Sequence, residues 1–234
     1  MKQLKKKITI FIVTKNRSFE LKRLLRSLNI SAKQSKEQLI VHLGIEHNSY
    51  KNIKNLSFLN IKKNFFKKGT SPIYIKNYFY KLDRSLIKVF LDDDVEVRGD
   101  FIKRLRNHYR KRKDCFISFN TVNFFTKNKE KISKTNLIEF TGFAEIGKKK
   151  LDQLINLNFV AEDTELCNRL IANNHNIFQD NSLQIIHHLS NRNRNLERIN
   201  NNGIANTIEI LRGYGPINNI KNFIDLIYQV LVSV

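Results

Sequence analysis

The chain has 234 residues, of which 41% are hydrophobic and 10% aromatic, so it is not a disordered polar polypeptide. This length suits one domain, or two small ones, with a substantial core. Its 42 Lys and Arg against 21 Asp and Glu give a net charge of +21. That balance predicts an anionic partner, such as nucleic acid, acidic lipid or a phosphate-bearing substrate. Two cysteines are too few for a disulfide framework or a cysteine-based zinc site, and they fit a reducing cytoplasm.

Apolar runs alternate with helical patterns through the first half. Strands are predicted at residues 8–14, 39–45, 56–61 and 86–91. The first helix is expected to be capped by Ser18, because Leu21, Leu24 and Leu28 then repeat at helical spacing. A second helix is expected over residues 72–82, with Pro72 in its first turn. This alternation predicts an α/β domain with a largely parallel sheet.

The second half is more mixed. Strands are predicted at residues 116–122, 137–146 and 185–189, and helices at 148–156 and 164–174. Two further helical segments follow, broken at residues 213–216. We expect one domain over residues 1–195 and a C-terminal helical extension over 196–234, packed on the domain or on a membrane surface. The apolar runs at either end, 8–13 and 223–234, are too short to cross a bilayer.

Three consecutive aspartates, Asp92, Asp93 and Asp94, end the fourth predicted strand. Residues two apart on a strand share a face, so we expect Asp92 and Asp94 to point into one site while Asp93 points elsewhere. Ligands bind at the carboxyl ends of strands in open α/β sheets, and crowded carboxylates favour Mg²⁺ or Mn²⁺ together with substrate phosphates. The alternative is a polar turn after a strand. Three acids in a row in so basic a chain favour the metal site.

Two other patterns carry possible chemistry. Glu162 and Asp163 precede an apolar helical pattern, where Asp163 is either a helix cap or a general base; taken alone, the pattern favours the cap. His187 and His188 follow a short apolar run and are either metal ligands or ordinary residues at a strand end.

Taken in order, these motifs resemble those of the family 2 glycosyltransferases, whose GT-A fold has a Rossmann-like nucleotide-binding sheet with flanking helices and a mixed second half. The resemblance spans residues 8 to about 189. It rests on the following matches: Thr14-Lys15-Asn16-Arg17 after the first strand, Asn64, Gly69 and Asn77 before the acids, Asp92-Asp93-Asp94 as the D-x-D motif, Thr141-Gly142-Phe143, and Glu162-Asp163 through Leu170 as E-D-x-x-L-x-x-R-L. Glu46 stands near the position where the family has an aspartate that contacts the base.

The resemblance implies transfer of a sugar, with inversion, from a nucleotide-sugar donor, expected to be UDP-linked, to a hydroxyl of a glycan or lipid-linked acceptor. Asp163 would be the base, and Asp94 with His187 or His188 would bind Mg²⁺ or Mn²⁺. The nucleotide would contact Thr14, Asn16, Arg17, Glu46, Asn77, Asp92 and Asp93, and the donor sugar or acceptor would contact Gly142, Phe143 and Glu162. The expected setting is the synthesis of bacterial surface polysaccharide, in the cytoplasm or peripherally on the inner membrane face.

A basic run over residues 103–113 has seven Lys and Arg and no acid. It is either a solvated helix or a surface that attracts anionic lipid. The rival functions are a basic nucleic-acid-binding protein without catalytic activity, a metal-dependent nuclease or phosphotransferase, and a transferase fold kept as a binding module. Nucleic-acid binding would leave the three aspartates unexplained, and we do not expect it.

Overall fold

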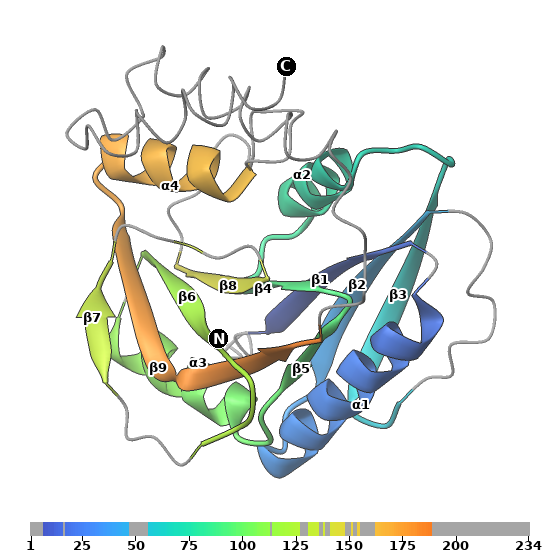
Figure 1. Ribbon diagram of the computed structural model, residues 1–234, viewed down its shortest axis with the longest axis horizontal. Helices are drawn as coiled ribbons and strands as arrows, with labels where there is room; N and C mark the ends of the chain where they lie inside the picture. Colours follow the sequence, from blue (N-terminus) through green and yellow to red (C-terminus); the bar gives the residue numbers. More distant parts are fainter. Residues whose placement is uncertain are drawn as a thin grey trace, which may run out of the picture.

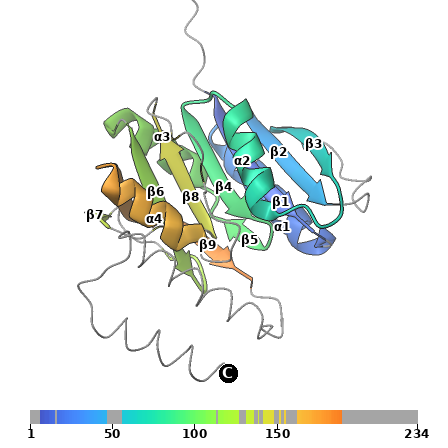
Figure 2. The ribbon, with the colours of Figure 1, turned by 90° about the horizontal axis from the view of Figure 1, so that it is seen from above.

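The computed structural model describes residues 7–15, 17–46, 56–112, 114–126, 131–135, 138, 141–147, 151, 154 and 162–188 (Figures 1 and 2). The strands are β1 (Ile8–Thr14), β2 (Leu39–Glu46), β3 (Leu59–Phe66), β4 (Ile87–Asp92), β5 (Val95–Val97), β6 (Cys115–Val122), β7 (Ile132–Lys134), β8 (Gly142–Ile146) and β9 (Asn176–His187). The helices are α1 (Ser18–Gln34), α2 (Pro72–Leu82), α3 (Phe101–Lys111) and α4 (Glu162–Ala172).

Within these residues nine strands form one sheet in the order β3-β2-β1-β4-β8-β6-β9-β5, with β7 paired to β9. Strands β1 to β4 pair in parallel. Beyond β4 the sheet is mixed, because β8 runs antiparallel to both β4 and β6, β9 is parallel to β6, and β5 is antiparallel to β9. The expected parallel sheet therefore describes the first half alone, and the α/β class with a mixed second half is confirmed.

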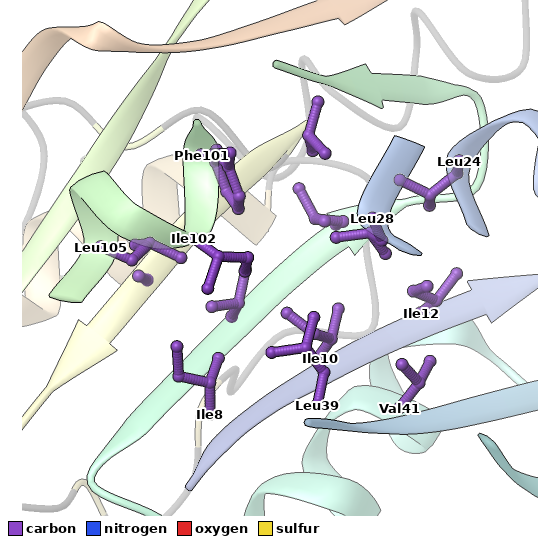
Figure 3. Packing of buried hydrophobic residues seen from close by; sticks show 14 of the residues in the cluster. Ile8, Ile10, Ile12, Leu24, Leu28, Leu39, Val41, Phe101, Ile102 and Leu105 are labelled. Atoms are coloured by element: carbon purple, nitrogen blue, oxygen red, sulfur yellow. The ribbon is translucent and has the colours of Figure 1, made fainter. Parts of the chain in front are cut away.

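The sheet is covered by helices on both faces. Figure 1 shows it between α2 and α4 above and α1 and α3 below, and Figure 2 shows α2 and α4 over the same face. Alternation along β1 explains this, because successive side chains of a strand point to opposite faces. Ile8, Ile10 and Ile12 pack with α1 and α3, whereas Phe11 packs with α2 and α4. Figure 3 shows leucines of α1 and residues of α3 packed over the isoleucines of β1.

The periodic elements of the first half lie close to where they were predicted. Helix α2 has the expected bounds, with Pro72 in its first turn and Ser71 Oγ accepting a hydrogen bond from the Ile73 amide. The cap predicted for Ser18 is wrong: Arg17 occupies the cap position of α1, and no side chain caps it. The third strand is β3, which begins at Leu59 rather than at residue 56.

The second half differs more from the prediction. Strand β9 begins at Asn176, nine residues before the predicted start, because a polar stretch is paired there between β6 and β7. Strand β8 occupies only residues 142–146 of the longer predicted strand. The short strands β5 and β7 were not predicted. The predicted helix at 148–156 lies mostly outside the described residues, as do the boundary at 195 and the C-terminal extension. Among the described helices, none has the length and apolar character needed to cross a membrane.

Two clusters of polar side chains are buried against the sheet. Lys88 Nζ lies 3.0 Å from Glu145 Oε1 between β4 and β8, and both side chains are at most 2% exposed. Lys88 also lies 5.0 Å from the centre of the Tyr80 ring. In the second group, Asp180 of β9 accepts hydrogen bonds from His108 Nε2 of α3 at 2.6 Å and from Ser182 Oγ at 2.7 Å. Hydrogen bonds of this kind make the burial of such groups tolerable.

Asp180→Asn tests the second group. Burial opposes ionisation of Asp180, but the hydrogen bonds from His108 and Ser182 outweigh it and hold the pKa of this carboxyl below its usual 3.8. The ionised carboxylate therefore stabilises the fold above that pH, and the contribution is lost as the pH falls below it. We expect Asp180→Asn to lower the free energy of unfolding by about 3 kcal/mol at pH 7, and by less near pH 3.

Urea unfolding at both pH values measures this difference. Asp114→Asn is the matched control, because Asp114 is exposed and its φ of 51° is one that asparagine adopts readily. An equal loss in the two variants, or a loss from Asp180→Asn that is independent of pH, would contradict the assignment.

Candidate active site

The carboxyl ends of the parallel strands β1, β2 and β4 meet at one edge of the sheet. The register pairs Val13 with Asp92 and Thr14 with Ile45, so Thr14, Glu46 and Asp92 end neighbouring strands. This edge is where open α/β sheets bind ligands. The predicted acidic residues therefore lie at the edge where the sequence analysis expected them.

The turn after β4 shapes the acidic motif. Strand β4 ends at Asp92, and Asp93 and Asp94 form the turn that leads into β5. The strand alternation expected for the three aspartates therefore does not extend to Asp93 and Asp94. Asp93 and Asp94 are each only 4% exposed, and both accept hydrogen bonds from Arg17 Nη1, at 2.7 and 2.5 Å. The guanidinium offsets the repulsion between two adjacent buried carboxylates.

Thr14 completes the support of Asp93. Its hydroxyl donates to Asp93 Oδ2 at 2.7 Å, and Thr14 itself is 1% exposed. Burial nevertheless raises the pKa of Asp93 to about 6, because it outweighs the favourable effects of Thr14 and Arg17. Thr14 and Arg17, predicted as nucleotide contacts, therefore hold the acidic turn in this structure.

The histidines are separated by the pairing of β5 with β9. Val95 is opposite His187, which brings His187 Nε2 to 3.3 Å from Asp94 Oδ1. This contact raises the pKa of His187; burial opposes the ionisation of Asp94, but the hydrogen bond with His187 and the charge of Arg17 lower its pKa on balance. His188 Nε2 instead lies 3.1 Å from Glu96 Oε2. Of the two histidines left open by the sequence, His187 is the one beside Asp94, and the side chain of His188 pairs with a different acid.

Lys76 was missed in the sequence analysis. It lies on α2, is 6% exposed, and places Nζ 3.8 Å from Asp92 Oδ1. A buried lysine on an otherwise apolar helix face is uncommon, and its position one residue before the predicted Asn77 was the available clue. Asn77 follows it on the same helix and is partly buried. Helix α2 thus supplies a positive charge to the acidic edge.

Glu46 is engaged within the protein. Its carboxylate accepts a hydrogen bond from the Gly69 amide at 2.5 Å and lies 2.9 Å from Lys15 Nζ. Burial opposes the ionisation of Glu46, but these two partners outweigh it and lower the pKa of Glu46. Gly69 has a φ of +85°, a conformation that glycine adopts without strain. Glu46 therefore ties the β3–α2 connection to the same edge.

The remaining predicted site residues fall into three sets. Gly142 and Phe143 belong to β8, and Phe143 is fully buried, with its ring centre 4.8 Å from that of Phe90. This position in the core does not support contact with a sugar. Asn16 lies outside the described residues. Glu162 and Asp163 begin α4, but the structure describes their backbone alone, so the choice between cap and base stays open.

The residues at this edge supply part of the coordination that a divalent cation needs. Within the described part of the chain, no three His, Cys, Asp or Glu side chains lie close enough to hold a metal ion on their own. Asp94 and His187 offer two adjacent ligands of the oxygen and imidazole types. Mg²⁺ and Mn²⁺ sites commonly take one or two protein carboxylates and complete their coordination with substrate phosphates and water. Asp94 and His187 therefore suit a site that a phosphate-bearing substrate completes.

Comparison with solved structures identifies the architecture. TarS from S. aureus aligns with a TM-score of 0.59 and 14% identity, over 88% of this chain and 40% of that one. The mannosyltransferase PcManGT from Pyrobaculum calidifontis, solved with GDP-Man and Mn²⁺, has a TM-score of 0.60 and 10% identity, over 87% and 64%. The fold is that of the GT-A glycosyltransferases.

GalNAc-T7, solved with UDP, GalNAc and Mn²⁺, has the same TM-score of 0.60 at 11% identity, over 81% of this chain and 44% of that one. The chain thus spans less than two thirds of the length of these three proteins. No protein-family model matches the sequence, and a search of curated proteins finds no match. The expected GT-A fold is therefore confirmed by three-dimensional similarity.

Arg17→Met tests the balance of charge in the acidic turn. Without the guanidinium, Asp93 and Asp94 repel each other in a buried turn, so we expect the free energy of unfolding to fall by about 2 kcal/mol. Adding Asp93→Asn removes one of the repelling charges and should recover a large part of that loss. Urea unfolding of the wild type, both single variants and the double variant measures the coupling. Strictly additive losses would contradict the shared role of Arg17.

Proposed function

We propose that this protein is a metal-dependent glycosyltransferase that moves a sugar from a nucleotide-sugar donor to an acceptor hydroxyl. The observation that carries the proposal is the meeting of Asp92, Asp93 and Asp94 with Arg17, Lys76 and His187 at the carboxyl edge of a GT-A sheet. A structural turn would need neither a buried lysine nor a histidine brought in from a distant strand. The PcManGT and GalNAc-T7 structures, which contain a nucleotide or nucleotide sugar and Mn²⁺, support this assignment.

Each side chain has a distinct part in the proposed reaction. Asp94 and His187 hold the divalent cation, which when bound neutralises the diphosphate leaving group. Lys76 contacts Asp92 and Arg17 contacts Asp94, so both add positive charge where the diphosphate is expected. Thr14 and Arg17 keep Asp93 in place, so the acidic turn has a defined geometry before substrate arrives.

The acceptor side of the proposal rests on the sequence. Asp163, in the first turn of α4, takes the proton of the acceptor hydroxyl as that oxygen attacks the anomeric carbon. Attack from the face opposite the leaving group inverts the configuration there. We further propose a UDP-linked donor and a glycan or lipid-linked acceptor, in the synthesis of bacterial surface polysaccharide on the cytoplasmic side of the membrane.

Nucleotide binding tests the donor site directly. We expect one nucleoside diphosphate to raise the melting temperature when Mn²⁺ is present. A ligand at 100 times its Kd adds about 2.7 kcal/mol of stability. Asp94→Asn should abolish the Mn²⁺-dependent part of the shift. Asp114→Asn should keep it, because Asp114 precedes β6 at the opposite edge of the sheet. The absence of a shift with every nucleotide, alongside tight salt-sensitive binding to RNA or DNA, would replace the proposal with a nucleic-acid-binding function.

Asp163→Asn tests the base. A positioned base contributes about 10²–10⁴-fold in rate, so we expect a loss of about 3–5 kcal/mol of transition-state stabilisation. The measurement is sugar transfer to acceptor with the nucleotide identified above. The nucleotide-dependent melting shift should be unchanged, which separates lost catalysis from lost folding. A variant with nearly full activity would leave helix capping as the role of Asp163.

A further inference from the structure

The outer surface of α1 carries a basic stripe with apolar residues in it. Lys22, Arg26 and Lys33 are exposed, and Phe19 and Ile30 lie among them with 72% and 52% of their surfaces exposed. At 3.6 residues per turn, these five side chains fall within about 100° of one another around the helix. The opposite side of α1, including Leu24 and Leu28, is buried against the sheet (Figure 3). The stripe therefore faces away from the core.

The charges of this stripe are not neutralised within the described residues. No ion pair there joins Lys22, Arg26 or Lys33 to an acidic side chain. Glu20 is the one acid within α1. Uncompensated cations on a solvent-facing helix attract a polyanionic surface.

Helix α3 contains most of the basic run singled out in the sequence, and several charges of that run are used internally. Arg106 pairs with Glu37, Arg104 with Asp100, and Arg112 donates to His108. Lys103 and Arg110 are exposed. Because α1 and α3 pack over the same face of the sheet, these two residues add to the charge of the α1 side. Fewer exposed, unpaired cations therefore lie on α3 than its basic run predicted.

We propose that the α1 stripe binds the surface of a bilayer that contains anionic lipid. Phe19 and Ile30 enter the boundary between headgroups and acyl chains, while the neighbouring lysines and arginine contact the headgroup phosphates. A nucleic acid would use the same cations, but it offers no apolar layer for an exposed aliphatic side chain such as Ile30. The helices over the opposite face of the sheet are less basic, since α4 carries three acids and one basic residue and α2 carries two lysines and no acid. This difference in charge between the two faces favours one orientation of the protein on the membrane.

This inference does not depend on the proposed function, but it bears on it. The stripe begins at Phe19, two residues after Arg17, so the basic face adjoins the candidate active site. A bilayer on this face would lie close to the acidic turn. An acceptor held in that bilayer could reach the site without leaving the membrane.

Vesicle sedimentation with the full chain tests the proposal. The probe is phosphatidylcholine vesicles with and without phosphatidylglycerol, at increasing salt. We expect salt-sensitive binding to the anionic vesicles alone. The triple variant K22Q/R26Q/K33Q should bind them about 100-fold more weakly, and Ile30→Ser about tenfold more weakly. The matched control K81Q/K131Q/K134Q removes three exposed lysines elsewhere and should bind as the wild type does.

Four results would overturn the proposal: equal binding to neutral vesicles, full binding by the α1 triple variant, an equal loss in the control, or tighter binding to an oligonucleotide that Ile30→Ser leaves unchanged. The last result would assign the stripe to nucleic acid. Thermal melting of each variant, with and without a nucleoside diphosphate, shows whether the fold and the candidate site are intact, so a failure here is distinguishable from a failure of the proposed function.

Discussion

The repulsion among three carboxylates at the end of β4 is the constraint on which the site depends. Strand β4 is buried along its length and ends at Asp92, so the three acids are crowded into the turn that follows and the last residue of the strand. Arg17, Lys76 and His187 compensate them, and each comes from a different part of the chain. The sheet order brings these three elements together. The fold therefore brings the compensating charges to the acids at this edge.

The sequence predicted those features that depend on local pattern. Helix α2 followed from Pro72 and an apolar repeat, and β1 from an unbroken apolar run. The acidic motif was found because three adjacent aspartates are rare in a basic chain. Lys76 escaped notice because a single lysine in a helix is ordinarily solvated, and only tertiary packing shows that this one is buried beside Asp92.

Features that depend on distant pairing could not be predicted. The choice between His187 and His188 is made by the register of β9 against β5, residues about ninety positions apart in the chain. Strand β9 was largely missed because Asp180 and Ser182 interrupt the apolar pattern. Both can be buried because Asp180 accepts hydrogen bonds from His108 and from Ser182. Hydrophobic periodicity in the sequence indicates where apolar side chains are buried. It does not indicate where hydrogen-bonded polar side chains are buried.

The Lys88–Glu145 pair has a consequence for how the two halves of the sheet join. These residues are direct partners where the sheet changes from parallel to antiparallel pairing. Sliding β8 by one residue would turn Glu145 to the other face and leave each charge alone in an apolar layer, which is far costlier than the loss of a surface contact. The pair thus fixes the register of β4 against β8, because alternative pairings of the two strands are penalised during folding. The residues that follow each strand therefore meet at one fixed offset.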